Sequence, residues 1–404
     1  MSQYLELFQS QRALIDGNSI PFLNQHRDAA AQTLAQLGLP TQKEERYRYT
    51  DVVGAFAPNY GLNLRQAHTA ANQPDAAVLR QAEALYGTLA SVQADAITAL
   101  NTMLVQDITV LCIPAGEQKE NPIRVSQLLR STAPLMQNRR LLIVAEPGSR
   151  ARILLNDKAD EGQDFLTTQV TEIFVGEGAD VEFYDIEQTH ARCHRFHQFY
   201  ADVQQGGRLT HTVFTLTGGL SRNTTQVRLS GKDAEANLYG CAVIDATQHC
   251  DNNTLIDHAV AGCRSNELYK YVVDQQAVGA FAGRVLVRPG ADQTDSRETN
   301  ANLVCTTQAR MYTQPMLEIY ADDVKCSHGS TVGQLNDEAL FYMRQRGISQ
   351  ADARLLLKQA FASEVINALP FEALRGRLQV LVDQRFRGEL NHCRTCNLCG
   401  TQNT

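Results

Sequence analysis

The chain has 404 residues with 37 basic and 44 acidic side chains, so its formal net charge is −7 and its isoelectric point lies near 5.8. This balance, without any basic run, argues against a nucleic-acid-binding protein, because an acidic surface repels phosphate backbones. The first residues, MSQYLELFQSQR, lack the apolar core of a signal peptide, and the longest strongly apolar run covers only residues 141–145, against the ~20 residues that span a bilayer. We therefore expect a soluble, cytoplasmic protein.

The ten cysteines are scattered along the chain except for three that gather near the C-terminus. Without a recognisable secretion signal, scattered cysteines are typical of free thiols that fill small apolar sites, not of a disulfide framework.

The N-terminal part of the chain favours helices. Ala29–Leu37 and Ala76–Ala90 are rich in Ala, Leu, Gln and Glu, which are good helix formers. We expect an N-terminal helical region over residues 1–100.

From residue 101 to residue 332 the pattern changes to that of strands. Short apolar or alternating runs are separated by glycine-containing turns, and no helical pattern intervenes, which argues against a doubly wound α/β sheet. The clearest runs are ITVLCI (108–113), RLLIVA (140–145), ARILLN (151–156), TEIFV (171–175), VEFYDI (181–186), HTVFTL (211–216), RVLVR (284–288) and LEIYA (317–321).

The turn glycines recur at an almost regular interval, at positions 148, 178, 206, 231, 262 and 290. A repeat of this length, built from strands and turns, is typical of a β-solenoid in which each coil stacks on the next. A β-sandwich with short turns is the alternative that this spacing leaves open.

Three amphipathic helices are predicted within residues 333–390. Asn336 is a candidate N-cap for the first helix, and a near capping box from Ser349 to Asp352 begins the second. Such a bundle either offers an apolar face to a partner or caps the open end of the solenoid. The apolar residues at helical spacing are Leu357, Phe361, Val365 and Leu369 in the second helix, and Phe371, Leu374, Leu378 and Leu381 in the third.

Several enzyme motifs are absent from the sequence. It contains no phosphate-binding loop, no serine-hydrolase motif, no zinc-protease motif and no EF-hand loop, which favours a non-enzymatic scaffold. A β-helix enzyme that acts on polysaccharides is a second hypothesis. The lack of tryptophan and of a recognisable signal peptide argues against it.

The stretch DVKCSHGSTVG (323–333) holds the main candidate site. If this stretch is extended, the side chains of Cys326 and His328 leave the same face of the strand. Thiolate and imidazole both bind iron, and a protonated His328 or a bound cation would favour the thiolate. An ordinary packed strand end would also contain such residues, and the two interpretations remain open on the residues alone.

Two further groups contain residue types that bind metals. In His190–His197 the cysteine and histidine side chains are divided between two faces of a strand, so we expect a structural role for them. In the tail, residues 391–404, the spacing of the cysteines suits zinc or an iron–sulfur cluster, and a flexible thiol-rich tail is the alternative. The candidate ligands there are His392, Cys393, Cys396 and Cys399.

Three stretches of the sequence resemble one known family. The window Glu318–Ile348, EIYADDVKCSHGSTVGQLNDEALFYMRQRGI, closely resembles the C-terminal signature of the SufD branch of the SufB/SufD family, which belongs to the Suf iron–sulfur cluster assembly machinery. PTQKEERYRYTD (40–51) is similar to the family's N-terminal motif, and ALNTMLVQD (99–107) to the segment that leads into its core domain. The CSHGSTVG segment favours the SufD branch, because SufB proteins typically carry an EHEAxTS-like stretch there.

The resemblance implies a mainly β fold, with a right-handed parallel β-helix over residues 101–332 between N-terminal and C-terminal helical regions. It also implies a scaffold that is not an enzyme, pairs with SufB through the β-helices and docks the ATPase SufC on the C-terminal helices. His328, together with Cys326, would lie at the SufB–SufD interface where a nascent cluster assembles. No stably bound cofactor is expected, only transient iron or a nascent cluster. The expected docking residues are Phe341, Leu357, Phe361 and Val365.

Some alternatives stay open at this point. The working unit is either a SufB–SufC–SufD complex or a SufD homodimer that carries SufC. The alternative is that the chain is a SufB-like paralogue, or an autonomous iron- or zinc-binding protein that uses its cysteine-rich tail. That tail is outside the family pattern, so the resemblance assigns it no role.

Overall fold

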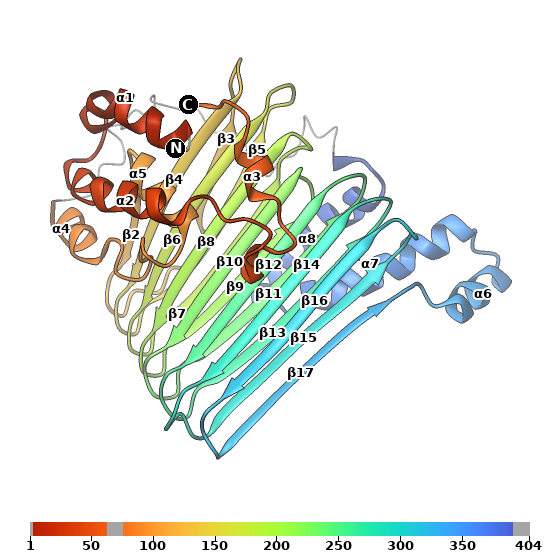
Figure 1. Cartoon of the computed structure of the whole chain (residues 1–404). Coiled ribbons are helices and arrows are strands. Elements are labelled where there is room, and N and C mark those ends of the chain that lie inside the picture. Colours follow the sequence, from red (N-terminus) through yellow and green to blue (C-terminus); the bar gives the residue numbers. More distant parts are fainter. Residues whose placement is uncertain (1–2, 63–75, 391–404) are drawn as a thin grey trace.

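The computed structural model describes residues 3–62 and 76–390, and their core is a solenoid of parallel strands (Figure 1). The chain passes back and forth between two sheets, of nine and eight strands, and makes about eight turns. Every strand pair within these residues is parallel. The expected β-solenoid is confirmed, and the sandwich is excluded because its sheets are antiparallel.

The two sheets are built from alternate strands of the chain. The first sheet contains β1 (Gly61–Leu62), β2 (Thr109–Ile113), β4 (Leu135–Ala145), β6 (Phe165–Val175), β8 (Cys193–Val203), β10 (Leu220–Leu229), β12 (His249–His258), β14 (Val278–Val287) and β16 (Arg310–Ile319). The second sheet contains β3 (Ile123–Leu129), β5 (Arg150–Ala159), β7 (Asp180–Gln188), β9 (Arg208–Thr215), β11 (Glu235–Ile244), β13 (Arg264–Val273), β15 (Thr294–Val304) and β17 (Val324–Gly333).

Successive coils stack in register. In the second sheet Glu235 pairs with Arg264, and Arg264 pairs with Asp295, so the length of a coil stays almost constant along the chain. Because neighbouring strands lie about 4.8 Å apart, each inward side chain lies directly over the one a coil earlier. The interior therefore consists of columns of side chains.

The glycines at the turns are required by backbone geometry. Five of the six have a positive φ, a conformation that side chains with a Cβ rarely adopt. At the sixth, Gly231, an added Cβ would lie only 1.8 Å from the backbone nitrogen of Gln205 in the previous coil. The five with positive φ are Gly148, Gly178, Gly206, Gly262 and Gly290.

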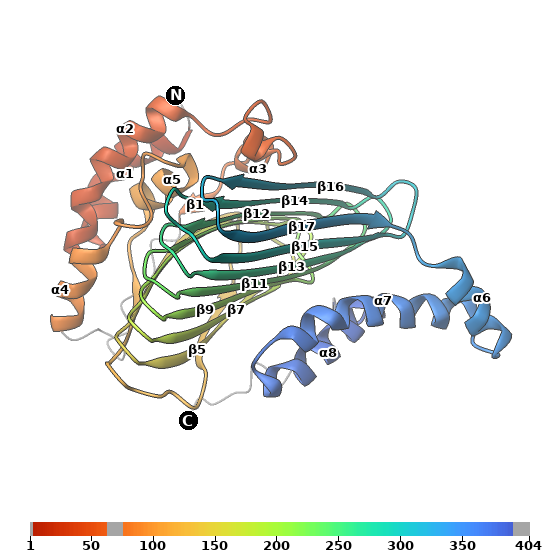
Figure 2. The same ribbon diagram turned by 90° about the horizontal axis from the view of Figure 1, so that it is seen from below.

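The N-terminal helices cover the outer face of the first sheet at its early coils (Figure 2). Met136, Leu166 and Phe196, from β4, β6 and β8, are buried against residues of the helices such as Phe8 and Leu100. The elements are α1 (Gln3–Gly17), η1 (Pro21–His26), α2 (Arg27–Leu37), η2 (Glu45–Tyr47), α3 (Val52–Phe56), α4 (Ala76–Leu85) and α5 (Ala96–Leu104).

An N-terminal strap, residues 45–50, crosses the first sheet and reaches its last strand. The Tyr49 ring stacks on Tyr312 of β16 with 4.1 Å between centroids, and Gln314 Nε2 donates to Glu45 Oε1 over 3.2 Å. The hydroxyl of Thr50 donates to the carboxylate of Asp251 on β12. These contacts involve Glu45, Tyr49 and Thr50 of the stretch PTQKEERYRYTD (40–51).

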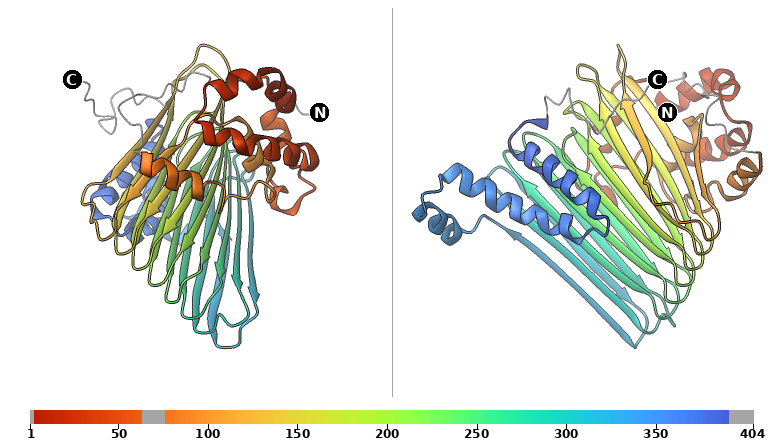
Figure 3. Two further views of the ribbon diagram at one scale, coloured as in Figure 1. Left: turned by 90° about the vertical axis from the view of Figure 1, so that its left-hand side faces the viewer. Right: turned by 180° about the vertical axis from the view of Figure 1, so that it is seen from behind.

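The C-terminal helices are α6 (Asp337–Gln345), α7 (Gln350–Ala368) and α8 (Glu372–Phe386). Their starts follow the expected caps: Asn336 Oδ1 accepts from Ala339 N over 2.9 Å, and Ser349 Oγ accepts from Asp352 N over 3.1 Å. Helices α7 and α8 pack on the outer face of the second sheet, while α6 extends away from it (Figure 3). Capping the open end was one of the two roles left open for these helices, and α7 and α8 do not have it, because they pack on the face of the second sheet. Within residues 3–62 and 76–390, no helix is long and apolar enough to cross a bilayer.

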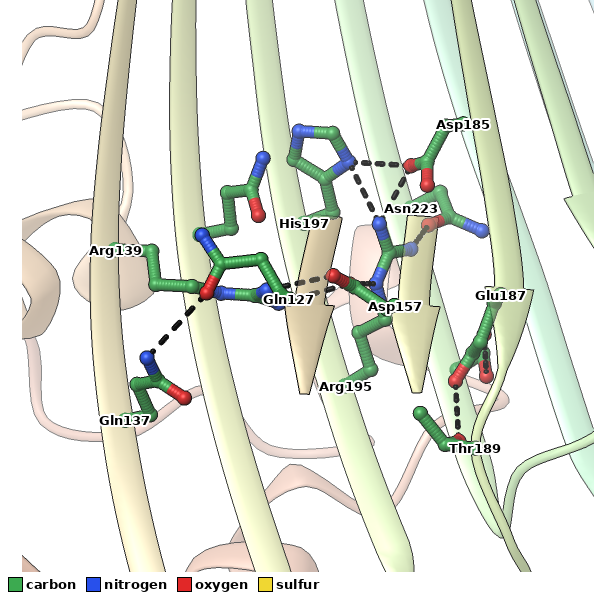
Figure 4. Close-up of polar contacts among 12 residues, drawn as sticks. Gln127, Gln137, Arg139, Asp157, Asp185, Glu187, Thr189, Arg195, His197 and Asn223 are labelled. Carbon is green, nitrogen blue, oxygen red and sulfur yellow. Dashed lines mark hydrogen bonds and ion pairs between the residues drawn. The ribbon is translucent and has the colours of Figure 1, made fainter. Parts of the chain in front are cut away.

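Part of the solenoid interior is a charged network (Figure 4). Arg195 donates to Asp157 over 2.8 Å, to Asp185 over 2.5 Å and to Asn223 over 2.8 Å, and Arg139 forms two bonds to Asp157 of 2.6 and 2.8 Å. Burial would raise the pKa of Asp185, but Arg195 and His197 outweigh it and hold this pKa below its ordinary value. Buried charges of this kind persist because they are paired and hydrogen-bonded.

The substitution Gly231→Ala tests the close stacking of the coils. Because the new Cβ would collide with the backbone at Gln205, one coil must shift. We expect the free energy of unfolding to fall by about 1–3 kcal/mol, as overpacked interiors do, and urea denaturation measures this. Gly376→Ala in α8 is the control, since an added Cβ there meets nothing within 4 Å. Equal losses in the two variants would contradict the stacking argument.

Candidate functional site at the open end of the solenoid

The solenoid ends at two strands with unpaired edges. β16 is the last strand of the first sheet and β17 the last strand of the second, and in the described part of the chain no strand pairs with their outer edges. Such edges present free main-chain donors and acceptors, which a second chain can pair with. This end of the molecule is therefore suited to contact a partner.

Cys326 and His328 both lie on β17, so the expected extended conformation is correct. Cys326 is half-buried against Val285, Val287 and Ala291 of the preceding coil, whereas His328 is exposed. Because side chains alternate along a strand, both residues face the interior side of the last coil. The structure thus brings the thiol and the imidazole to one face at the open end.

The thiol of Cys326 stands at the end of a column of hydroxyl groups. It follows Ser296 and Ser265 in register, and the two serine hydroxyls are 2.8 Å apart. Burial raises the pKa of Cys326, and Asp295 raises it further, while a bond with the Ser296 backbone lowers it. The group is therefore a thiol at neutral pH, and a bound cation would be needed to form the thiolate.

His328 stands at the end of a column that contains two buried acids. Glu267, Glu298 and His328 occupy one register position on β13, β15 and β17. Glu267 is fully buried and Glu298 is 1% exposed. Glu267 Oε2 accepts a bond of 2.7 Å from Thr254, whereas neither oxygen of Glu298 has a hydrogen-bond partner in the described residues.

A glycine in the facing sheet makes room for Glu298. An added Cβ at Gly283 of β14 would lie 2.3 Å from Glu298 Oε1, so a larger residue would displace the carboxyl group. Burial raises the pKa of Glu298 and of Glu267, and the proximity of Glu267 raises that of Glu298 further. Both carboxyl groups consequently favour the neutral form.

Sequence reasoning missed both acids, although a usable signal exists. Glu298 precedes His328 by one coil of this solenoid, and Glu267 precedes Glu298 by one more. Counting back by one coil from His328 would have led to them. The spacing of the turn glycines alone does not fix the register of the strands to within one residue.

The stretch His190–His197 takes part in core packing. His197 Nδ1 lies 2.8 Å from Asp185 Oδ2 and its Nε2 lies 2.9 Å from Thr171 Oγ1. Burial raises the pKa of Cys193 to about 12. In residues 3–62 and 76–390, no group of three or more His, Cys, Asp or Glu side chains converges to hold a metal ion. The tail residues His392, Cys393, Cys396 and Cys399 lie outside the described residues.

The expected docking residues on the C-terminal helices divide into two groups. Val365 is completely buried against the second sheet, and the Phe361 ring lies 4.2 Å from Lys270 Nζ. Leu357 is half-buried. Proposing Val365 as a contact for another chain was therefore wrong, because its helical face is already covered. On α6, by contrast, Phe341 is 64% exposed and its neighbour Tyr342 is 60% exposed.

Comparison with known proteins finds two family models and several relatives that match this chain. The family model described as SUF system FeS cluster assembly, SufBD core domain, matches residues 128–361, and that of the SufBD protein N-terminal region matches residues 1–78 and 78–125. The iron–sulfur cluster assembly protein SufD of Escherichia coli is 29% identical over 88% of this chain and 92% of its own. A SufBD family protein of Synechocystis is 28% identical over 93% of this chain and 94% of its own, and SufD of Bacillus subtilis is 24% identical over 72% and 67%.

The pH dependence of stability tests the buried acid. Because the pKa of Glu298 is raised in the folded state and ordinary in the unfolded state, folding loses stability as pH rises above the unfolded pKa. We expect Glu298→Gln to remove part of this loss, so that the variant gains stability over the wild type between pH 5 and pH 9, as measured by urea denaturation. Glu177→Gln, at an exposed turn, is the control for the loss of one acidic side chain. Parallel profiles for wild type and Glu298→Gln would contradict the burial argument.

Proposed function

Because the chain belongs to the SufBD family of iron–sulfur cluster assembly proteins and is a SufD homologue, we propose that it is a non-catalytic scaffold subunit that pairs with SufB and docks the ATPase SufC in the cytoplasm. The observation that carries this proposal is the position of Cys326 and His328 on a terminal strand with an unpaired edge. In this proposal iron and the nascent cluster are cargo, bound transiently.

The open end supports pairing through the solenoid. Each of the last two strands has 10 residues, so a partner strand could form a long main-chain ladder on either edge. Ser330 Oγ lies 2.7 Å from Thr313 Oγ1, which links β17 to β16 beside His328. A sister solenoid seated on these edges would enclose His328 and Cys326 in the seam between the two subunits.

The chemistry of the two residues suits cluster assembly. Imidazole and thiolate both bind iron, and thiolates are the usual ligands of iron–sulfur clusters. Burial raises the pKa of the Cys326 thiol, and a bound cation would favour the thiolate. An empty site is therefore less reactive than a site that has received iron.

The exposed aromatic residues of α6 support docking of the ATPase. Phe341 and Tyr342 project from a helix that extends away from the solenoid (Figure 3). Exposed aromatic pairs are typical of protein interfaces. A separate ATPase subunit also agrees with the absence of a phosphate-binding loop from this sequence.

The chain connection between the two proposed contacts suggests how they communicate. Only residues 334–336 separate the end of β17 from the start of α6. A displacement of α6 by a bound ATPase would therefore pull directly on the strand that contains Cys326 and His328. In this way nucleotide-driven motion would open the seam to iron or sulfur.

The substitution His328→Ala tests the site. We expect the variant chain to assemble normally with SufB and SufC, but the purified complex should contain at least about tenfold less iron and sulfide. The loss of a metal ligand that contributes more than about 1.4 kcal/mol to the binding free energy lowers affinity by such a factor. Iron and acid-labile sulfide are measured after anaerobic purification. Ser327→Ala, on the opposite face of the same strand, should retain the wild-type content. A normal cluster yield from His328→Ala would remove the site assignment.

The double substitution Phe341→Ala and Tyr342→Ala tests ATPase docking. Both side chains are largely exposed, and Tyr342 bonds to the nearby Arg346, so the fold should be retained while the affinity for SufC falls at least about tenfold. Calorimetric titration with purified SufC measures this change. Leu14→Ala, which removes an exposed apolar side chain from α1, is the control. Unchanged affinity in the double variant would place the docking surface elsewhere.

A further inference from the structure

The carboxyl group of Glu298 has no role in the function described so far. We propose, as an extension of the proposed function and dependent on it, that Glu298 is a second iron ligand from this chain and binds the ion on the inner side of His328. The pair would form half of a ferrous iron site, and the partner subunit or the incoming sulfide would supply the remaining ligands.

The register places the two side chains for joint binding. Glu298 and His328 are direct partners on the parallel strands β15 and β17. Neighbouring strands are about 4.8 Å apart, so side chains on the same face begin at that separation. Metal bonds to imidazole nitrogen and carboxylate oxygen are about 2.0–2.2 Å long, and both side chains can reach one ion between them.

The unpartnered state of Glu298 distinguishes it from the other buried acids. Asp157 and Asp185 are bound by Arg195, and Glu187 accepts from Thr189 over 3.1 Å and from Ser221. Glu298 is the one buried carboxyl group in the described residues whose two oxygens both lack a partner. A buried polar group without a partner costs free energy, which a bound cation would recover.

The surroundings hold this carboxyl group at the open end of its column. Gly283 leaves the space that Oε1 occupies, and Glu267, fixed by Thr254, fills the position one coil deeper. The carboxyl group is therefore blocked from moving inward, and the open end lies on its other side. An ion that enters past His328 would meet Glu298 first.

The donor set favours ferrous iron over a preformed cluster. Carboxylate and imidazole together suit Fe(II), whereas the iron atoms of iron–sulfur clusters favour thiolate ligands. As the metal–oxygen bond forms, the carboxyl proton leaves to solvent. Within the described residues three ligands do not converge, which agrees with a half-site and not with a complete site. Glu298 and His328 would thus receive iron, while the thiolate of Cys326, two positions earlier on β17, would bind an iron atom of the growing iron–sulfur cluster.

The test compares Glu298→Gln with Glu187→Gln in the full-length chain, purified with SufB and SufC without oxygen. Glu187 is an equally buried interior acid whose pKa burial raises to about 7, so its variant controls for the loss of a buried carboxyl group. Fe(II) affinity is measured by competition with a colorimetric chelator, and assembly by size-exclusion chromatography. The tail cysteines are the same in all samples, so any iron that they bind contributes equally.

We expect Glu298→Gln to lower Fe(II) affinity at least about tenfold in an assembled complex, a change of about 1.4 kcal/mol. Glu187→Gln should match the wild type, and adding His328→Ala to Glu298→Gln should lower affinity less than the sum of the single changes. Glu298→Asp, which keeps a carboxylate, should retain more affinity than Glu298→Gln.

Two outcomes separate this inference from the proposal on which it rests. If His328→Ala weakens iron binding but Glu298→Gln does not, Glu298 is not a ligand and the assembly role of His328 stands. If neither variant changes Fe(II) affinity or cluster content, the site assignment at the open end fails together with this inference.

Discussion

The in-register stacking of parallel coils is the constraint on which this structure depends. Each strand hydrogen-bonds to the strands one coil before and one coil after it, so an inward side chain always meets the same column. The turn glycines keep the coils close enough for this pairing, as the short distance at Gly231 shows. The register also decides that the column under His328 contains two carboxyl groups and the column under Cys326 two hydroxyl groups.

Much of the fold was predictable from the sequence, because the apolar strands and the helix caps have local signals. The strands β10, β12 and β15 lack such signals, since their inward positions include Asn223, Asn252 and Asn300 where apolar residues were expected. These side chains form bonds between coils, for example Asn223 Nδ2 to Asn252 Oδ1 over 2.9 Å. Asn252 also donates to the Tyr271 hydroxyl and Asn300 to the Tyr269 carbonyl, so these buried amides have partners and hydrophobic alternation is not needed there.

Only the part of the candidate site that depends on local backbone geometry was predictable from the sequence. An extended backbone is enough to place Cys326 and His328 on one face, but Glu298 joins them through a register that no local pattern specifies. The C-terminal helices show a second limit of prediction from the sequence. Val365 belongs to a correctly predicted apolar face, yet a sequence pattern does not tell whether another subunit or the same chain covers that face.

The contacts of the N-terminal strap affect how the protein folds during its synthesis on the ribosome. These contacts extend from Tyr47 with Asp95, 48 positions apart, to Glu45 with Gln314, 269 positions apart. The contacts of Tyr49 with Tyr312 and of Glu45 with Gln314 therefore form only after nearly the whole solenoid has been synthesised. Contacts between such distant residues slow folding and prolong the exposure of unpaired strands. The terminal strands β16 and β17, which a sister subunit would later cover, are also the last strands of the solenoid to leave the ribosome.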